Sequence, residues 1–323
     1  MADFKIDSTP TASPSAIPRP NAPVEPQYSS SSTKKHGQRC AENNIAASIP
    51  RPKLRLHVET LRHPATASFL TLIPDIASTL DKALHDIVKY LYSSPLHAPS
   101  DSPSHQKVQQ PSFSPSIPPT RSVTLHLRDI DGVAYTTGTE LDDDHKEIHL
   151  SLPYIHHCMT MANPSHELVG VLTHELVHCY QHTSPPESIN DREVKITHPP
   201  GGLIEGIADF VRLKAGLEPP HWKKPQSAEE RAEKWDAGYQ NTAYFLAWVE
   251  DVRVGRGAVG MLNDRLLRVG YVGEEEGDSG VGFWKSLFGA EVAQLWEEYG
   301  TYLDGAKDEK AQGQWEDEIL NVE

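Results

Sequence analysis

Alternating apolar and polar residues predict three β-strands. Leu54, Leu56 and Val58 alternate with polar neighbours, and the same alternation recurs over 123–127 and 148–152. Successive side chains of a strand point to opposite faces of a sheet. Each of these three strands is therefore predicted to bury one face.

Apolar spacings of three and four residues predict helices between and after these strands. Ile76, Leu80, Leu84 and Leu91 fall on one face of a helix that Asp75 would cap. Further helical patterns cover 165–182, 204–215, 235–253 and 284–303. Strands followed by helices indicate an α+β domain.

Composition separates this domain from the rest of the chain. Residues 1–50 are rich in Ser and Pro, so they bury too little apolar surface to offset the entropy of ordering, and we predict a disordered arm. Seven prolines within 95–119 predict a surface insertion, and residues 304–323 are predicted to be an acidic tail. One folded domain is expected over 51–303.

Charge and cysteine usage exclude several classes of protein. The chain of 323 residues has 30 basic and 45 acidic side chains, a net charge of −15, which argues against nucleic-acid binding. No apolar stretch is long enough to span a membrane, and no signal-peptide pattern is visible, so the sequence predicts a cytoplasmic protein. Cys40, Cys158 and Cys179 are widely spaced and are predicted to be free thiols.

Candidate chemistry begins with the sequence Thr173-His174-Glu175-Leu176-Val177-His178, an HExxH pattern. On a helix, His174 and His178 lie one turn apart, so both can bind one metal ion while Glu175 reaches its water. Asn163 and Pro164 provide a helix start just upstream. Two surface histidines beside an acidic residue are the alternative interpretation.

A catalytic zinc ion needs a third protein ligand, for which two candidates compete. His182 lies a further turn along the helix, about 6 Å beyond His178, out of reach of the same ion. The third histidine of metzincins is also missing, because Ser184 stands at its position. Glu205 is the better candidate, with Asp209 one turn later to accept the free N–H of a ligating histidine. Paired carboxylates on a solvated face are the alternative.

These motifs resemble known peptidases. HExxH followed by ExxxD is similar to the gluzincin metallopeptidases. The stretch Gly201–Gly216, with His221-Trp222 and Trp235–Tyr239, resembles the plant and fungal basic secretory protein family. Supporting similarity covers nearly the whole ordered region, including Gly132–Thr136 and His174–Gln181.

The resemblance implies a zincin-like fold and a zinc peptidase. Its parts would be an N-terminal mixed sheet whose edge strand lines the cleft, an active-site helix and a helical C-terminal half. The implied metal ligands are His174, His178 and Glu205 around one zinc ion, with Asp209 behind them. The family is linked to defence in plants and is secreted, whereas this chain is acidic and shows no signal peptide. Its segment 183–198 is also longer than the family's usual connection.

The expected activity is endopeptidase cleavage of peptide or protein substrates. Glu175 would act as general base on a zinc-activated water, and Tyr239, His221 or Arg212 would donate to the oxyanion. The acidic triplet Asp142–Asp144 and the pair His156-His157 are interpreted as solvated surface rather than a second metal site.

Two other functions remain open from the sequence. The chain could be a zincin-fold binding or defence-interaction protein with little or no turnover. A purely structural zinc site is a third interpretation, but structural zinc normally has four protein ligands.

Overall fold

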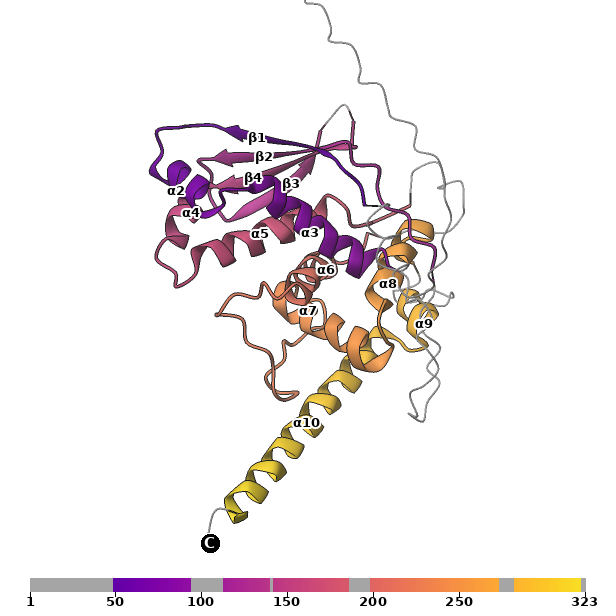
Figure 1. Ribbon diagram of the computed structural model, residues 1–323. Coiled ribbons are helices and arrows are strands. Elements are labelled where there is room, and N and C mark those ends of the chain that lie inside the picture. Colours follow the sequence, from indigo (N-terminus) through magenta and orange to yellow (C-terminus); the bar gives the residue numbers. More distant parts are fainter. Residues whose placement is uncertain (1–48, 94–112, 140–141, 186–197, 273–281, 321–323) are drawn as a thin grey trace, which may run out of the picture. The chain divides into compact units, whose positions relative to one another are not determined.

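The computed structural model describes residues 49–93, 113–139, 142–185, 198–272 and 282–320, with side chains up to 306 in the last range. As predicted, the fold is α+β, with a mixed four-stranded sheet followed by helices (Figure 1). The predicted arm up to residue 48, most of the 95–119 insertion and Cys40 lie outside the described residues.

The sheet has the strand order β1-β2-β4-β3. The three predicted strands are confirmed as β1 (Lys53–Val58), β2 (Ser122–Arg128) and β4 (His145–Ser151), which run parallel to one another. The fourth, β3 (Ala134–Gly138), pairs antiparallel with β4 and forms an edge of the sheet. The sequence did not predict β3 because its five residues include only one large apolar side chain.

Burial in the sheet follows strand position. Val123, Leu125 and Leu127 of β2 are fully buried, as predicted for one face of a central strand. The prediction is wrong for Leu56 of β1, which is 40% exposed. The reason is that β1 is the second edge of the sheet, where an alternating pattern does not ensure burial.

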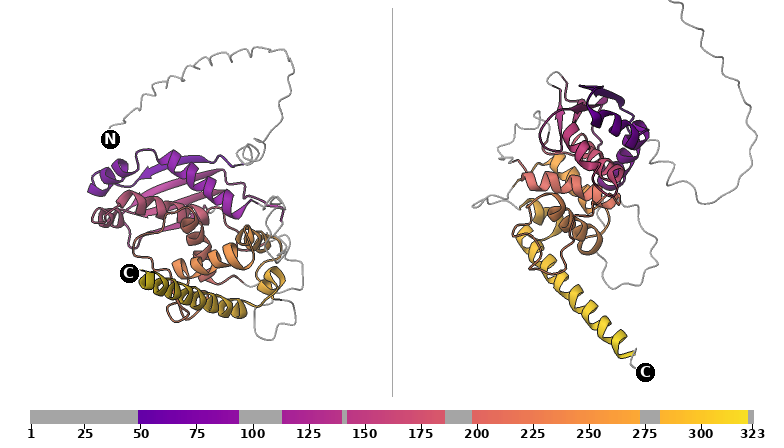
Figure 2. Two further views of the ribbon diagram at one scale, coloured as in Figure 1. Left: turned by 60° about the horizontal axis from the view of Figure 1, so that its bottom comes forward. Right: turned by 90° about the vertical axis from the view of Figure 1, so that its left-hand side faces the viewer.

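Two helices form the layer next to the sheet. The predicted helix α3 (Ile76–Leu91) is confirmed, and Asp75 caps it by accepting the Ser78 N–H at 2.9 Å. Helix α5 (Pro164–His178) begins at the predicted Asn163 cap. It ends at His178, earlier than predicted. Figures 1 and 2 show α5 between the sheet and the next helix, α6 (Gly201–Lys214).

Short helices were not predicted from periodicity. These are α2 (Pro64–Leu72), α4 (Leu152–Cys158) and α8 (Ala258–Arg268). Leu152, predicted to end a strand, instead begins α4, where the Ser151 hydroxyl accepts the Tyr154 N–H at 3.2 Å. Cys158 and Cys179 are buried free thiols, as predicted.

The C-terminal half is helical and differs from the prediction mainly at helix ends. The region 235–253 forms α7 (Tyr239–Trp248) and a π-helical turn, η2 (Val249–Arg253). The region 284–303 is two helices, α9 (Phe283–Phe288) and α10 (Val292–Leu320), because Gly289 breaks it with a φ of +78°. Helix α10 continues through most of the predicted acidic tail.

Helices α6 and α7 pack at very short distance. A Cβ atom placed on Gly206 of α6 would lie 2.3 Å from Cγ2 of Thr242 on α7, so only glycine fits there. No helix in the described ranges combines the length and apolar character needed to cross a bilayer.

Candidate metal centre

Helix α5 places two imidazoles beside each other. His174 and His178 are four residues apart, and their Nε2 atoms lie 3.1 Å apart, as expected for side chains one turn apart on a helix. Both side chains are largely buried, with exposed fractions of 10% and 16%. Leu172 and Leu176 anchor the opposite side of α5 in the core.

Helix α6 contributes a carboxylate to the same point. Glu205 Oε2 lies 3.1 Å from His174 Nε2 and 3.7 Å from His178 Nε2. One ligand atom from each residue lies within 4.8 Å of the others. In the part of the chain that the structure describes, no other group of three His, Cys, Asp or Glu side chains meets this condition.

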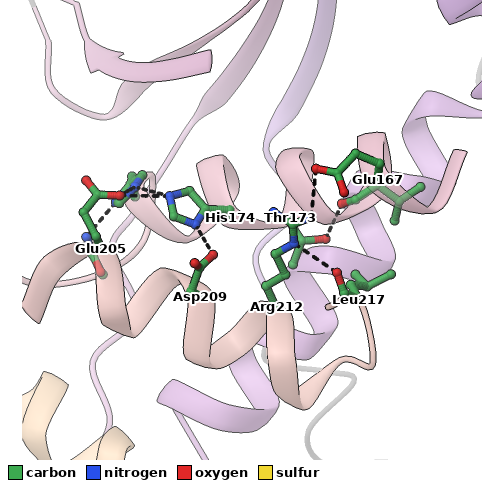
Figure 3. Close-up of polar contacts among 10 residues, drawn as sticks. Glu167, Thr173, His174, Glu205, Asp209, Arg212 and Leu217 are labelled. Carbon is green, nitrogen blue, oxygen red and sulfur yellow. Dashed lines mark hydrogen bonds and ion pairs between the residues drawn. The ribbon is translucent and has the colours of Figure 1, made fainter. Parts of the chain in front are cut away.

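The second nitrogen of each imidazole is also held. His174 Nδ1 lies 2.7 Å from Asp209 Oδ1, one turn after Glu205 on α6 (Figure 3). His178 Nδ1 lies 2.8 Å from the amide nitrogen of Gln181, whose amide oxygen could accept from Nδ1 once the amide is turned over. An outer acceptor, such as Asp209 for His174, orients an imidazole that binds metal through its other nitrogen, so the residues present fit a metal ion.

Hydrogen bonds within the centre shift the pKa values of its groups. Burial alone would lower the pKa of His174, but the hydrogen bonds to Asp209 and Glu205 outweigh it and raise this pKa to about 9. Burial alone would raise the pKa of Glu205, but the hydrogen bonds with His174 and His178 bring it well below its usual value. In the metal-free protein the centre therefore holds a proton on His174.

Glu175, which follows His174 on α5, meets the edge strand of the sheet. Its Oε2 accepts a hydrogen bond from Thr136 Oγ1 at 2.7 Å, which comes from β3. Its side chain is nearly buried, with 6% of the residue exposed. Thr136 thus ties Glu175 to the edge of the sheet.

A cleft of about 980 Å³ runs past these residues. Its walls include His174, Glu175, His178 and Glu205, together with Val133 and residues 134–136 of β3. Tyr239 and His221, the sequence candidates for an oxyanion donor, both line the cleft as well. The expected metal ligands, Glu175 and the oxyanion candidates Tyr239 and His221 thus line one cleft.

Tyr239 lies beside the candidate metal ligand His174. Its ring lies nearly parallel to that of His174, with 6.1 Å between the ring centroids. The negative charge of Glu205 and, next, burial raise the pKa of Tyr239, so its phenol keeps its proton. Tyr239 is also the non-glycine residue with positive φ among those described, at +47°.

Arg212 has other partners. Its Nη2 donates to Glu167 Oε1 at 3.2 Å and its Nε donates to the Leu217 carbonyl at 3.0 Å (Figure 3). The side chains of Arg212 and Glu167 are only 8% and 5% exposed. This buried ion pair supports packing of α6 on α5 and occupies the guanidinium.

Comparison with known proteins identifies the family. The family model BSP, described as peptidase of plants and bacteria, matches residues 51–299. The chain belongs to the BSP family. This match confirms the resemblance seen in the sequence. No curated protein and no solved structure matches the chain.

Other sequence candidates lie away from the candidate metal centre of this BSP-family protein. His182 follows the end of α5, and its Nε2 is 2.8 Å from the Ser116 carbonyl oxygen. Each carboxylate of the acidic triplet contacts a basic side chain, Asp142 and Asp144 contacting Arg121 and Asp143 contacting Lys146. Residues His156 and His157 are exposed at the end of α4. Most of the segment 183–198 lies outside the described residues.

Two residues near the centre were missed as site residues from the sequence. Gln181 lies three residues after His178, and that spacing could have indicated a partner for its imidazole. Thr136 carries no such signal, because its contact with Glu175 depends on where β3 pairs in the sheet.

Proposed function

We propose that this BSP-family protein is a zinc-dependent peptidase of the gluzincin type with a zincin-like fold. The observation that carries the proposal is the convergence of His174, His178 and Glu205 within 4.8 Å, with Glu175 beside them in the cleft. Two imidazoles and one carboxylate are the donor set of catalytic zinc in metallopeptidases. Three protein ligands leave a coordination position open for chemistry.

When bound, zinc polarises a substrate carbonyl and makes a water ligand more acidic. Glu175 is placed to take up the proton of the attacking water and to pass it to the leaving amine. Thr136 restrains the Glu175 carboxylate through the 2.7 Å hydrogen bond, so the base does not have to be ordered during the reaction.

An oxyanion forms when water adds to the peptide carbonyl, and a fixed donor stabilises it. Tyr239 suits this role because its phenol stays protonated and its ring lies beside His174. His221 is the second candidate, since it lines the same cleft. Arg212 does not suit it, because Glu167 and the Leu217 carbonyl hold its guanidinium.

Peptide substrates are proposed to lie along β3. Among the described residues this strand has one neighbour, β4, which leaves its other edge available there for pairing with an extended chain. Val133 and residues 134–136 of β3 form part of the cleft wall that includes Glu175. Backbone pairing would bring a peptide bond past the base without requiring a particular side chain.

The test is cleavage of an unbiased peptide pool by the full chain, compared with Glu175→Gln and with Glu229→Gln, an exposed control. We expect the parent and the control to cut and Glu175→Gln to lose activity while it retains bound zinc. The positions of the cuts distinguish internal from terminal cleavage. If the zinc-loaded parent cuts no peptide, the proposal fails, and a binding function becomes the better hypothesis.

A further inference from the structure

The outer face of the sheet carries a row of aromatic and imidazole rings across all four strands. In the strand register His57 pairs with His126, His126 pairs with His149, and His149 pairs with Tyr135. The three consecutive ring-centroid distances are 4.9, 4.7 and 4.5 Å. We call these four residues the histidine row.

This row lies on the opposite face of the sheet from the candidate metal centre. Consecutive residues of a strand point to opposite faces. Tyr135 stacks on His149 in the row, whereas Thr136, the next residue, bonds to Glu175. Tyr135 also lines the cleft at this edge of the sheet, whereas His57 and His126, on β1 and β2, are not among the residues that line it.

The first two histidines of the row have ligand geometry. His57 Nδ1 and His126 Nδ1 lie 3.1 Å apart at an exposed position. Two imidazole nitrogens on one tetrahedral ion, each about 2.0–2.1 Å from it, are about 3.3 Å apart. His174 and His178 in the candidate metal centre show the same nitrogen separation, 3.1 Å.

Glu147 sets which nitrogen of His126 is available. Its Oε1 faces His126 Nε2 at 3.6 Å, and its Oε2 faces His149 Nε2 at 3.3 Å. His126 Nε2 is buried and has no hydrogen-bond partner among the described residues. A proton on Nε2 is favoured by the facing carboxylate, which leaves the lone pair on the exposed Nδ1.

The remaining groups favour His57 and His126 over His149 as ligands. Arg128 Nη1 donates to His149 Nδ1 at 3.4 Å, so that nitrogen is occupied. Burial is the main cause that lowers the pKa of His126, which keeps this imidazole neutral. Neutral imidazole is the form that binds metal.

We propose that His57 and His126 form a second, solvent-exposed site for a divalent transition-metal ion. Imidazole pairs suit Zn²⁺, Ni²⁺ and Cu²⁺, and water completes the coordination on the open side. Glu147 lies behind the site, 3.6 Å from the other nitrogen of His126, where its negative charge favours a proton on that nitrogen. The site does not depend on the proposed peptidase activity.

The test measures zinc binding by equilibrium dialysis of the full chain. After the high-affinity site is filled, further Zn²⁺ is added to the parent, to His57→Ala and to His85→Ala. His57 is exposed, so its substitution should leave the fold intact, and His85 is a matched exposed histidine on α3. We expect a second zinc ion in the parent and in His85→Ala, and at least tenfold weaker second binding in His57→Ala.

A second variant checks the other ligand. His126→Asn should weaken binding of the second zinc ion by a similar factor. Circular dichroism reports whether this variant folds. The inference is overturned if the parent binds no second zinc, or if second binding persists unchanged in His57→Ala. It is also overturned if His85→Ala loses second binding to the same extent, because the effect would then belong to surface histidines in general.

Discussion

Replacing Gln181 with leucine tests how His178 is prepared for metal binding. A metal ion on His178 Nε2 leaves a proton on Nδ1, which needs an acceptor. The amide nitrogen of Gln181 lies 2.8 Å from Nδ1, and its Oε1 has no hydrogen-bond partner in the described part of the chain. Half a turn of the amide therefore brings Oε1 into the accepting position. Leucine keeps the bulk of this side chain and removes the acceptor.

The expected loss of zinc affinity depends on the kind of hydrogen-bond acceptor that the substitution removes. Removing an outer partner of a metal-bound histidine weakens metal affinity by about 10–100-fold. The Gln181 amide is neutral, and hydrogen bonds to charged acceptors are about twice as strong. We therefore expect about a tenfold loss for Gln181→Leu, or about 1.4 kcal/mol. Asp209→Ala should approach about a hundredfold loss.

The assay is competition for zinc against a chromophoric chelator, with the full chain at fixed pH. Gln294→Leu is the control, because Gln294 is exposed on α10 and its amide donates to Glu298 at 2.9 Å, far along the chain from the candidate metal centre. If Gln181→Leu binds zinc as tightly as the parent while Asp209→Ala does not, the reasoning about Gln181 is refuted. If Gln294→Leu weakens zinc binding as much as Gln181→Leu does, the effect comes from a glutamine-to-leucine substitution in general.

Three further predictions concern the same helices. The pKa of His174 in the metal-free protein is about 9, so at any pH below 9 zinc must displace a proton to bind. Zinc affinity should therefore rise about tenfold per pH unit up to about pH 9. Competition assays at several pH values check this. Glu167→Ala removes the carboxylate that pairs with the buried Arg212 guanidinium. This should lower the free energy of unfolding, measured by urea titration, by about 3–5 kcal/mol. A loss under about 1 kcal/mol would show that the ion pair is solvated. Gly206→Ala should lower the free energy of unfolding by about 1–3 kcal/mol, because the added Cβ meets Thr242 Cγ2. Thr242→Ser removes that methyl group, so the double variant should recover part of this stability in thermal unfolding.

The ligand set could be predicted because it depends on local spacing. His174 and His178 lie on one helix, and Glu205 and Asp209 lie one turn apart on another, so the 3.6-residue period places each pair. Only the meeting of α5 with α6 had to be assumed, and the structure places their side chains 2.7–3.7 Å apart.

Contacts that depend on strand pairing could not be predicted. Thr136 reaches Glu175 because β3 pairs antiparallel with β4, which no pattern in its five residues reveals. The histidine row likewise requires the strand order and register, since His57 and His126 are distant in the sequence. The exposure of Leu56 was missed for the same reason, because alternation does not tell an edge strand from a central one.

The left-handed backbone of Tyr239 implies a trade-off between stability and chemistry. A non-glycine residue at a φ of +47° carries a conformational cost of about 1 kcal/mol or more, which glycine at the same position would relieve. The phenol beside His174 would be lost with it. Selection of variants for heat resistance alone would therefore favour replacements at residue 239 that empty the cleft of its best-placed donor.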